Sequence, residues 1–243
     1  RRHGDQGEVR PKRIFQTLRF CGMPQRFHDV ELRSIFAVLL DPMSGASGLA
    51  TTRISPGKDP QVRLQLQPHQ ALVLRTLDRS AEGAPWPYHE PSGKATRIRG
   101  NWSVEFIAGG PTRPDSFVAP ALASWTRLGG REATRFAGTA RYTITFDAPG
   151  RANTYLLDLG SVKDSARVWL NDQAAGTLIN RPFQVLVKGL RHRGNLLEIE
   201  VTNVAANRIR DMDLRQQPWM GDHVAHARGY GVLNIGTTTN RQL

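Results

Sequence analysis

Alternation of apolar and polar residues is the sequence feature that most constrains the fold of this chain. In residues 139–147, TARYTITFD, and in residues 195–203, NLLEIEVTN, apolar side chains recur at every second position. Successive side chains of a β-strand point to opposite faces, so this period of two indicates strands with one buried face. The same pattern runs through residues 61–77, 101–110 and 182–190. Turn-forming clusters separate these stretches, and no comparably clear helical pattern lies between residues 60 and 205, which predicts an all-β, sandwich-like fold.

Residues 161–178, SVKDSARVWLNDQAAGTL, are predicted to form a hairpin. One strand would end at Asn171, and the partner strand would restart at Gly176, where a side chain would crowd the turn. Asn and Asp tolerate left-handed backbone conformations and form Asx turns, which suits Asn171 and Asp172 to this connection. Trp169 alternates with its two apolar neighbours and is therefore expected to point to the opposite face of the strand.

The distribution of these patterns divides the chain into five predicted segments. They are an atypical or truncated N-terminal segment, a partial β-rich module, a linker or crossing segment, a β-sandwich and a C-terminal tail, over residues 1–34, 35–77, 78–99, 100–213 and 214–243. The third segment holds prolines and glycines without periodicity. It is either a linker or a crossing segment that packs Trp86 and Tyr88 onto a neighbouring sheet.

Composition excludes several functional classes. The formal net charge is +12, but the 33 basic residues are dispersed and no basic helix, zinc-finger or RNA-binding motif accompanies them, so no nucleic-acid partner is expected. No apolar run approaches the roughly 20 residues of a membrane-spanning helix, so no membrane partner is expected either. A single cysteine, Cys21, rules out an internal disulfide. Residues 1–13 are charged and lack the apolar region of a signal peptide.

The sequence contains no catalytic or metal-binding motif. Glu198 and Glu200 stand two residues apart on one strand, which is typical of a solvated sheet face rather than of a catalytic acid pair. His223 and His226 have the helical i, i+3 spacing, but no carboxylate or third ligand accompanies them, so no metal site is predicted. Nucleophile-elbow, phosphate-loop and Rossmann glycine patterns are absent as well.

The order of several motifs resembles the C-terminal β-sandwich of the bacterial α-L-rhamnosidases of glycoside hydrolase family 106. The motifs are NWSVEFIAGGP, ALASWTRL, TRFAGTARYTITFDAPG, the predicted hairpin with the PF segment that follows it, and LRHRGNLLEIEVTNVAANRIRDMD. The same order is similar to the jelly-roll, galactose-binding-like domain of family 2 enzymes such as β-galactosidases. The resemblance covers residues 100–213, and residues 37–54 and 62–76 resemble the β-rich module that precedes this sandwich in the rhamnosidases.

The resemblance implies a non-catalytic role for this chain. In the family, hydrolysis belongs to an upstream (β/α) barrel with acidic catalytic residues and a calcium ion, and nothing here has the alternating βα pattern of such a barrel. No catalytic residue and no cofactor therefore carry over, and the chain is expected to be inactive alone. The implied partners are the upstream catalytic barrel and a rhamnose-containing glycan, and the parent enzyme would be periplasmic or extracellular.

Carbohydrate binding would need an exposed indole face and polar side chains that bind hydroxyl groups. The candidate contacts combine two tryptophans with amide, carboxylate and guanidinium groups: Trp125, Trp169, Asn171, Asp172, Asn203, Asn207 and Arg208. The competing interpretation is that the tryptophans pack in the core or between domains. Two hypotheses follow: a module that binds a rhamnoside or supports the catalytic barrel, and a purely structural or interaction module without a ligand. The second predicts an exposed apolar patch.

Overall fold

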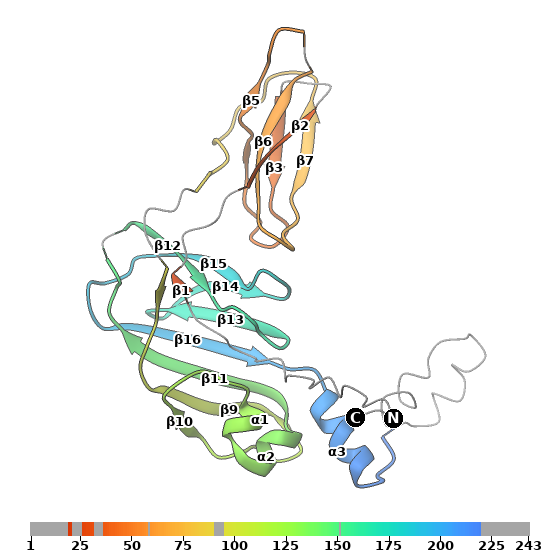
Figure 1. Ribbon diagram of the computed structural model, residues 1–243, viewed down its shortest axis with the longest axis vertical. Helices are drawn as coiled ribbons and strands as arrows, with labels where there is room; N and C mark the ends of the chain where they lie inside the picture. The colour runs from red at the N-terminus through yellow and green to blue at the C-terminus, as the bar shows by residue number, and fades with distance from the viewer. Residues whose placement is uncertain are drawn as a thin grey trace, which may run out of the picture.

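The computed structural model describes two bodies built from antiparallel strands, which Figure 1 shows one above the other. Side chains are described from Phe36 onward. The described residues are 19–20, 26–31, 36–57, 59–89, 95–150 and 152–219. Strands dominate both bodies and the helices are few and short, so the prediction of an all-β sandwich is confirmed.

The larger body contains a six-stranded sheet in the order β10-β9-β11-β16-β13-β14. Its strands are β9 (Trp102–Gly110), β10 (Phe117–Ala119), β11 (Ala137–Phe146), β13 (Ser165–Leu170), β14 (Gln173–Leu178) and β16 (Asn195–Thr202). Neighbouring strands are antiparallel throughout. The apolar positions of the two clearest alternating stretches are all buried: Ala140, Tyr142, Ile144, Phe146, Leu197, Ile199 and Val201. The alternation therefore identified the core face of this sheet correctly.

A four-stranded sheet covers that core face and completes the sandwich. Its order is β15-β12-β1-β8, with β1 (Arg19–Phe20), β8 (Thr96–Arg97), β12 (Thr154–Asp158) and β15 (Gln184–Lys188). Leu157 of β12 and Val187 of β15 join the same buried cluster as Ile199 of the larger sheet. Strands β1 and β8 come from residues outside the predicted sandwich segment, and two-residue strands are too short to leave a period in the sequence.

The smaller body consists of two three-stranded sheets, β2-β6-β5 and β4-β3-β7. Their strands are β2 (Arg26–Glu31), β3 (Phe36–Leu40), β4 (Ser47–Leu49), β5 (Thr52–Arg53), β6 (Gln61–Leu66) and β7 (Val73–Leu77). Trp86 is buried among Leu39, Val62 and Leu64, and Tyr88 packs against this cluster. The hydroxyl of Tyr88 donates to the Arg63 carbonyl oxygen at 2.8 Å. Trp86 and Tyr88, which follow β7 in the chain, therefore pack onto the sheets of the smaller body.

In the part of the chain that the structure describes, three short helices accompany the larger body: α1 (Trp125–Leu128), α2 (Gly130–Arg135) and α3 (Ala206–Leu214). The first two lie in a stretch where the sequence shows no clear helical pattern. Helices of four and six residues are too short to show a helical period, and the Ser124 side chain that caps α1 is a local signal only. Within the described residues, no helix has the length and apolar character needed to cross a membrane.

The predicted hairpin is present, but its second strand begins earlier than expected. Asn171 and Asp172 form the turn, with φ of 50° and 66°, and β14 begins at Gln173 rather than at Gly176. Positive φ at both central residues is the geometry of a type I′ turn, which joins two strands with minimal distortion. Gly176 lies inside β14, where a Cβ atom would stand 3.1 Å from Val185 Cγ2. This glycine therefore makes room for packing between strands and has no part in the turn.

Candidate functional site

The candidate carbohydrate contacts lie near opposite ends of β16 rather than around one point. The Asn171 amide donates to the Leu196 carbonyl oxygen at 2.8 Å, next to the start of β16, whereas Asn203 directly follows its end. A strand of this length spans about 25 Å. Trp169, Asn171 and Asp172 therefore form one group of candidates. Asn203, Asn207 and Arg208 form another.

Trp125 belongs to the core of the sandwich. Its side chain is 1% exposed and packs edge-on against Phe106 and Phe136, with ring centroids 5.8 and 6.1 Å away. No face of this indole is open to a ligand, so the interpretation of Trp125 as an exposed stacking platform is corrected. Because α1 interrupts the strand pattern here, the local sequence has no alternation that could have indicated this burial.

Asn203 and Asn207 hold the backbone at the start of β11. Their Nδ2 atoms both donate to the Phe136 carbonyl oxygen, at 3.1 and 3.3 Å. The Asn203 Oδ1 atom also accepts a hydrogen bond of 2.7 Å from the Gly138 amide. Both side chains thus satisfy backbone groups that the sheet leaves unpaired at this end. Their described contacts are structural.

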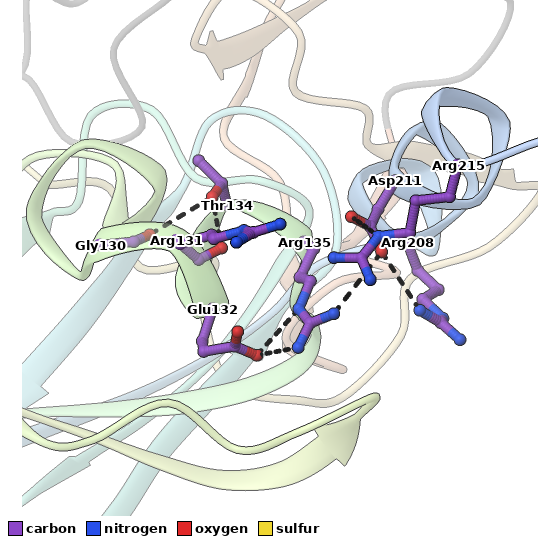
Figure 2. Close-up of polar contacts among 8 residues, drawn as sticks. All are labelled: Gly130, Arg131, Glu132, Thr134, Arg135, Arg208, Asp211 and Arg215. Carbon is purple, nitrogen blue, oxygen red and sulfur yellow. Dashed lines mark hydrogen bonds and ion pairs between the residues drawn. The ribbon is translucent and has the colours of Figure 1, made fainter.

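Arg208 belongs to a polar cluster that ties α3 to α2 (Figure 2). Three guanidinium groups surround the Asp211 carboxylate: Arg208 at 3.4 Å, Arg215 at 2.9 Å and Arg135 of α2 at 4.0 Å. Arg135 also bonds to Glu132 within α2. One carboxylate shared by arginines of both helices fixes the position of α3, and this engages Arg208 internally.

The side-chain amides of Asn171 and Asn195 stabilise the tip of the hairpin. Asn171 Nδ2 donates to Asn195 Oδ1 at 3.1 Å, and Asn171 Oδ1 accepts from the Leu196 amide at 3.0 Å. Asn195 is fully buried and also bonds to both backbone groups of Arg191. The neighbouring Asp172 is exposed and makes no hydrogen bond or ion pair with other described residues. Asn171 thus stabilises the turn, whereas Asp172 is exposed to solvent.

Trp169 lies on the outer face of the six-stranded sheet, as its alternation predicts. Val168 and Leu170 are buried beneath the sheet, whereas Trp169 is half-buried on the other side. The Arg167 guanidinium carbon lies 5.8 Å from the centre of the indole ring, within the range of a cation–π contact. Among the candidate contacts, Trp169 is the aromatic residue that keeps surface on the exterior of the sandwich.

Two rows of side chains cross the outer face beside Trp169. We call the first the polar row: Thr143, Glu198, Trp169 and Ala174 stand directly opposite one another on β11, β16, β13 and β14. Thr143 and Glu198 are half-buried, and neither makes a hydrogen bond or ion pair within the part of the chain that the structure describes. A free hydroxyl, a free carboxylate and an indole therefore lie side by side.

The second row, which we call the charged row, contains Glu105, Arg141, Glu200 and Arg167 on β9, β11, β16 and β13. Arg141 Nη2 lies 2.9 Å from Glu200 Oε1, and Arg167 Nη2 lies 3.3 Å from Glu200 Oε2. The hydrogen bond to Glu200 is the largest cause that raises the pKa of Arg141, and the nearby charges of Glu200, Glu198 and Glu105 add to it. The two guanidinium groups cover Glu200 and bury it.

The sequence placed Glu198 and Glu200 on one face correctly but missed that they differ in burial. The side chain of Glu200 is 11% exposed because arginines from both neighbouring strands bond to it. The order of strands determines these partners, and no local pattern reports it. His223 and His226 lie outside the described residues. Within the described ranges, no group of three His, Cys, Asp or Glu side chains could hold a metal ion.

Comparison with known proteins identifies one informative likeness. No family model and no curated protein matches the sequence. A solved rhamnosidase from Novosphingobium sp. PP1Y superposes with a TM-score of 0.64 and 25% identity over 82% of this chain. The chain spans 19% of the length of that rhamnosidase. The chain is thus similar in structure to a β-sandwich portion of a glycoside hydrolase.

Two further solved structures show lower likeness. A β-D-glucuronidase of Dictyoglomus thermophilum has a TM-score of 0.36 and 17% identity, covering 44% of this chain and 19% of that chain. An anti-sigma factor domain-containing protein has a TM-score of 0.32 and 14% identity, covering 75% of each chain. Likeness at this level carries no argument about function.

Proposed function

We propose that this chain is the non-catalytic accessory β-sandwich portion of an α-L-rhamnosidase-like glycoside hydrolase of family 106. The observation that carries the proposal is the likeness to a rhamnosidase over 82% of this chain but only 19% of that enzyme. Catalysis would belong to a barrel in the part of such an enzyme that this chain does not match. The calcium ion that the family resemblance implies would belong to that barrel too.

The accessory role that we propose is binding of a rhamnose-containing glycan. The outer face of the six-stranded sheet supports this role, because it combines a half-buried indole with a free carboxylate and a free hydroxyl. The face of an aromatic ring attracts the weakly positive C–H groups of a sugar ring, and carboxylate and hydroxyl groups bind sugar hydroxyls. One aromatic contact and a few hydrogen bonds predict a dissociation constant on the order of 1 mM.

Affinity electrophoresis tests this proposal on the full 243-residue chain. A rhamnose-containing polysaccharide cast into a native gel should retard the chain, whereas a gel that contains a rhamnose-free polysaccharide should not. The same preparation should release no nitrophenol from p-nitrophenyl α-L-rhamnopyranoside. Equal mobility in the two gels would overturn the binding role, and hydrolysis that persists through purification would overturn the non-catalytic role.

Support of a catalytic barrel is a second candidate function, favoured by apolar residues exposed on the smaller body. Leu40 and Val73 stand directly opposite each other on β3 and β7, with 36% and 53% of their surface exposed. Met43, in the turn that follows β3, is 37% exposed. If this patch normally contacts another domain, the double variant Leu40→Thr, Val73→Thr should remain monomeric at higher concentration than the wild type in light scattering. Unchanged self-association would contradict the idea that this patch contacts another domain.

A further inference from the structure

We infer that the polar row on the outer face of the six-stranded sheet is a binding site for an uncharged pyranoside and that it discriminates against uronates. This inference rests on the proposed function and specifies its location and ligand class. The site consists of Thr143, Glu198 and Trp169, with Arg167 as a positioning residue beside the indole.

The register of the sheet brings these groups together. Glu198 is the direct cross-strand partner of Thr143 on one side and of Trp169 on the other. Neighbouring strands lie about 4.8 Å apart, so the hydroxyl, carboxylate and indole occupy a flat strip about 10 Å wide. Beyond the indole stands Ala174, whose methyl group leaves that side of Trp169 unshielded. The strip thus has the dimensions to contact one or two sugar rings laid across the strands.

Glu198 is the hydrogen-bond acceptor of this strip. Its carboxylate makes no hydrogen bond or ion pair with any described residue, although Arg141 of the charged row is near enough for its charge to interact with that of Glu198. Glu200, two residues along the same strand, binds Arg141 and Arg167 through its two oxygens. Since Arg141 and Arg167 are already paired with Glu200, Glu198 keeps its oxygens free. A half-buried carboxylate with free oxygens is well suited to accept two hydroxyl hydrogen bonds from a sugar.

Arg167 fixes the orientation of Trp169. Its guanidinium is bonded to Glu200 at 3.3 Å and lies 5.8 Å from the centre of the Trp169 ring. An arginine held at one end by a buried carboxylate restricts the rotamers of the ring that it contacts. Because the ring is already restricted in the free protein, less side-chain conformational entropy is lost when a sugar stacks on Trp169. Arg167 acts through Trp169 and not as an independent anion receptor, because its guanidinium group is engaged with Glu200.

The charge of the outer face determines the ligand class. The two rows carry three carboxylates, from Glu105, Glu198 and Glu200, and two guanidinium groups, from Arg141 and Arg167, which leaves a local charge of −1. The chain as a whole has a net charge of +12. This face is therefore a slightly acidic area on a basic protein, and its one unpaired charged group beside the indole is negative. A uronate placed on Trp169 would bring its carboxylate close to Glu198, and the repulsion weakens binding.

Titration followed by intrinsic tryptophan fluorescence tests both the location and the ligand class. The probes are methyl α-L-rhamnopyranoside and methyl α-D-glucuronide, added separately to the full chain. The wild type should bind the rhamnoside about tenfold more tightly than the glucuronide. Glu198→Gln should bring this ratio close to one, because it removes the repulsion. Asp115→Asn, which makes the same change at an exposed position between β9 and β10, should leave the ratio unchanged.

Trp169→Ala in the affinity gel separates failure of this inference from failure of the proposed function. The variant should lose at least about tenfold in affinity and should migrate as it does without the glycan. Retardation that persists in Trp169→Ala would overturn the site while leaving the proposed function in place. A wild type that is not retarded would overturn both. Equal affinity for rhamnoside and glucuronide in a retarded wild type would overturn the ligand class alone.

Discussion

Arg141 and Glu200 form a direct ion pair across β11 and β16, with 2.9 Å between Nη2 and Oε1. The pair is uneven in exposure: the arginine side chain is 39% exposed, whereas that of Glu200 is 11% exposed. A charge so nearly withdrawn from water needs its partners, and Arg167 supplies the second one. Glu200 therefore holds the side chains of Arg141 and Arg167 in place within the charged row.

Glu200→Gln should destabilise the fold by about 1–2 kcal/mol, since it removes the charge that two arginines share. Equilibrium unfolding in urea, followed by circular dichroism, measures this change in the free energy of unfolding. Glu105→Gln, an exposed position in the same row, is the control and should change stability by less than about 0.5 kcal/mol. Equal effects of the two variants would show that Glu200 is no more important than a surface charge.

Asn195→Ala should be among the most destabilising single substitutions, with a loss of about 2–4 kcal/mol. The buried amide bonds to Asn171, to both backbone groups of Arg191 and to the Phe146 carbonyl oxygen. Its removal leaves these groups unsatisfied in the interior. Thermal and urea unfolding would measure the loss, with the exposed Asn180→Ala as a matched control. A loss below about 1 kcal/mol, the contribution of one ordinary hydrogen bond, would contradict this role.

Asp172→Gly should stabilise the chain by about 0.5–1 kcal/mol. Asp172 has φ of 66°, a conformation that glycine adopts without the steric penalty of a side chain, and Asn-Gly is a preferred pair in type I′ turns. Asp172→Val should lower stability, because a β-branched side chain disfavours positive φ. The midpoint of urea unfolding should therefore follow the order Gly, Asp, Val at this position. Any other order would be inconsistent with a type I′ turn.

Asp211→Asn should loosen α3 without unfolding the sandwich. The substitution weakens the contacts to three arginines, including the one that joins α3 to α2. Hydrogen exchange measured by mass spectrometry should become faster in peptides from residues 206–214 and stay unchanged in β11 and β16. Asp115→Asn again serves as the control. Unchanged exchange in α3 would mean that other contacts hold this helix.

Stability should depend on pH through His89. Partial burial is the main cause that lowers the pKa of His89 below its usual value of 6.5, and the positive charge of Lys188 lowers it further. The unfolded chain therefore binds the proton more readily than the folded chain. The contribution of neutral His89 to the free energy of unfolding is fully present above pH 6.5. It is lost as the pH falls through the lowered pKa of His89 in the folded chain. Urea midpoints of the wild type should fall across this window, and those of His89→Gln should fall less.

The sequence predicted the sandwich well where strands are long and one face is buried. In residues 139–147 and 195–203, the alternation of apolar and polar residues identifies the buried face. One side of each strand packs against the core and the other side faces solvent. The outward direction of Trp169 followed from the same rule. Strands β1 and β8 were missed, because two residues cannot show a period and their positions depend on partners far away in the chain.

The candidate site was predicted less well than the fold. Trp125 and Trp169 look alike in the sequence, yet the first is buried at the start of α1 and the second lies half-buried on the outer face of the six-stranded sheet. Asn203 seemed available for a ligand, whereas its amide bonds to backbone groups more than sixty residues away. Such long-range partners are set by the packing of the whole domain. Local residue types therefore indicated which groups can bind sugars, but not which of them are free.

Nuclear magnetic resonance tests the central claim most directly, because it reports on each indole separately. Methyl α-L-rhamnopyranoside is titrated into the isotopically labelled chain, with the indole signals of its five tryptophans assigned through single Trp→Phe variants. We predict saturable shifts of the Trp169 Nε1–H signal and of the backbone amides of Glu198 and Thr143, with no shift at the buried Trp125. Absence of any shift, or shifts confined to residues away from the polar row, would contradict the account.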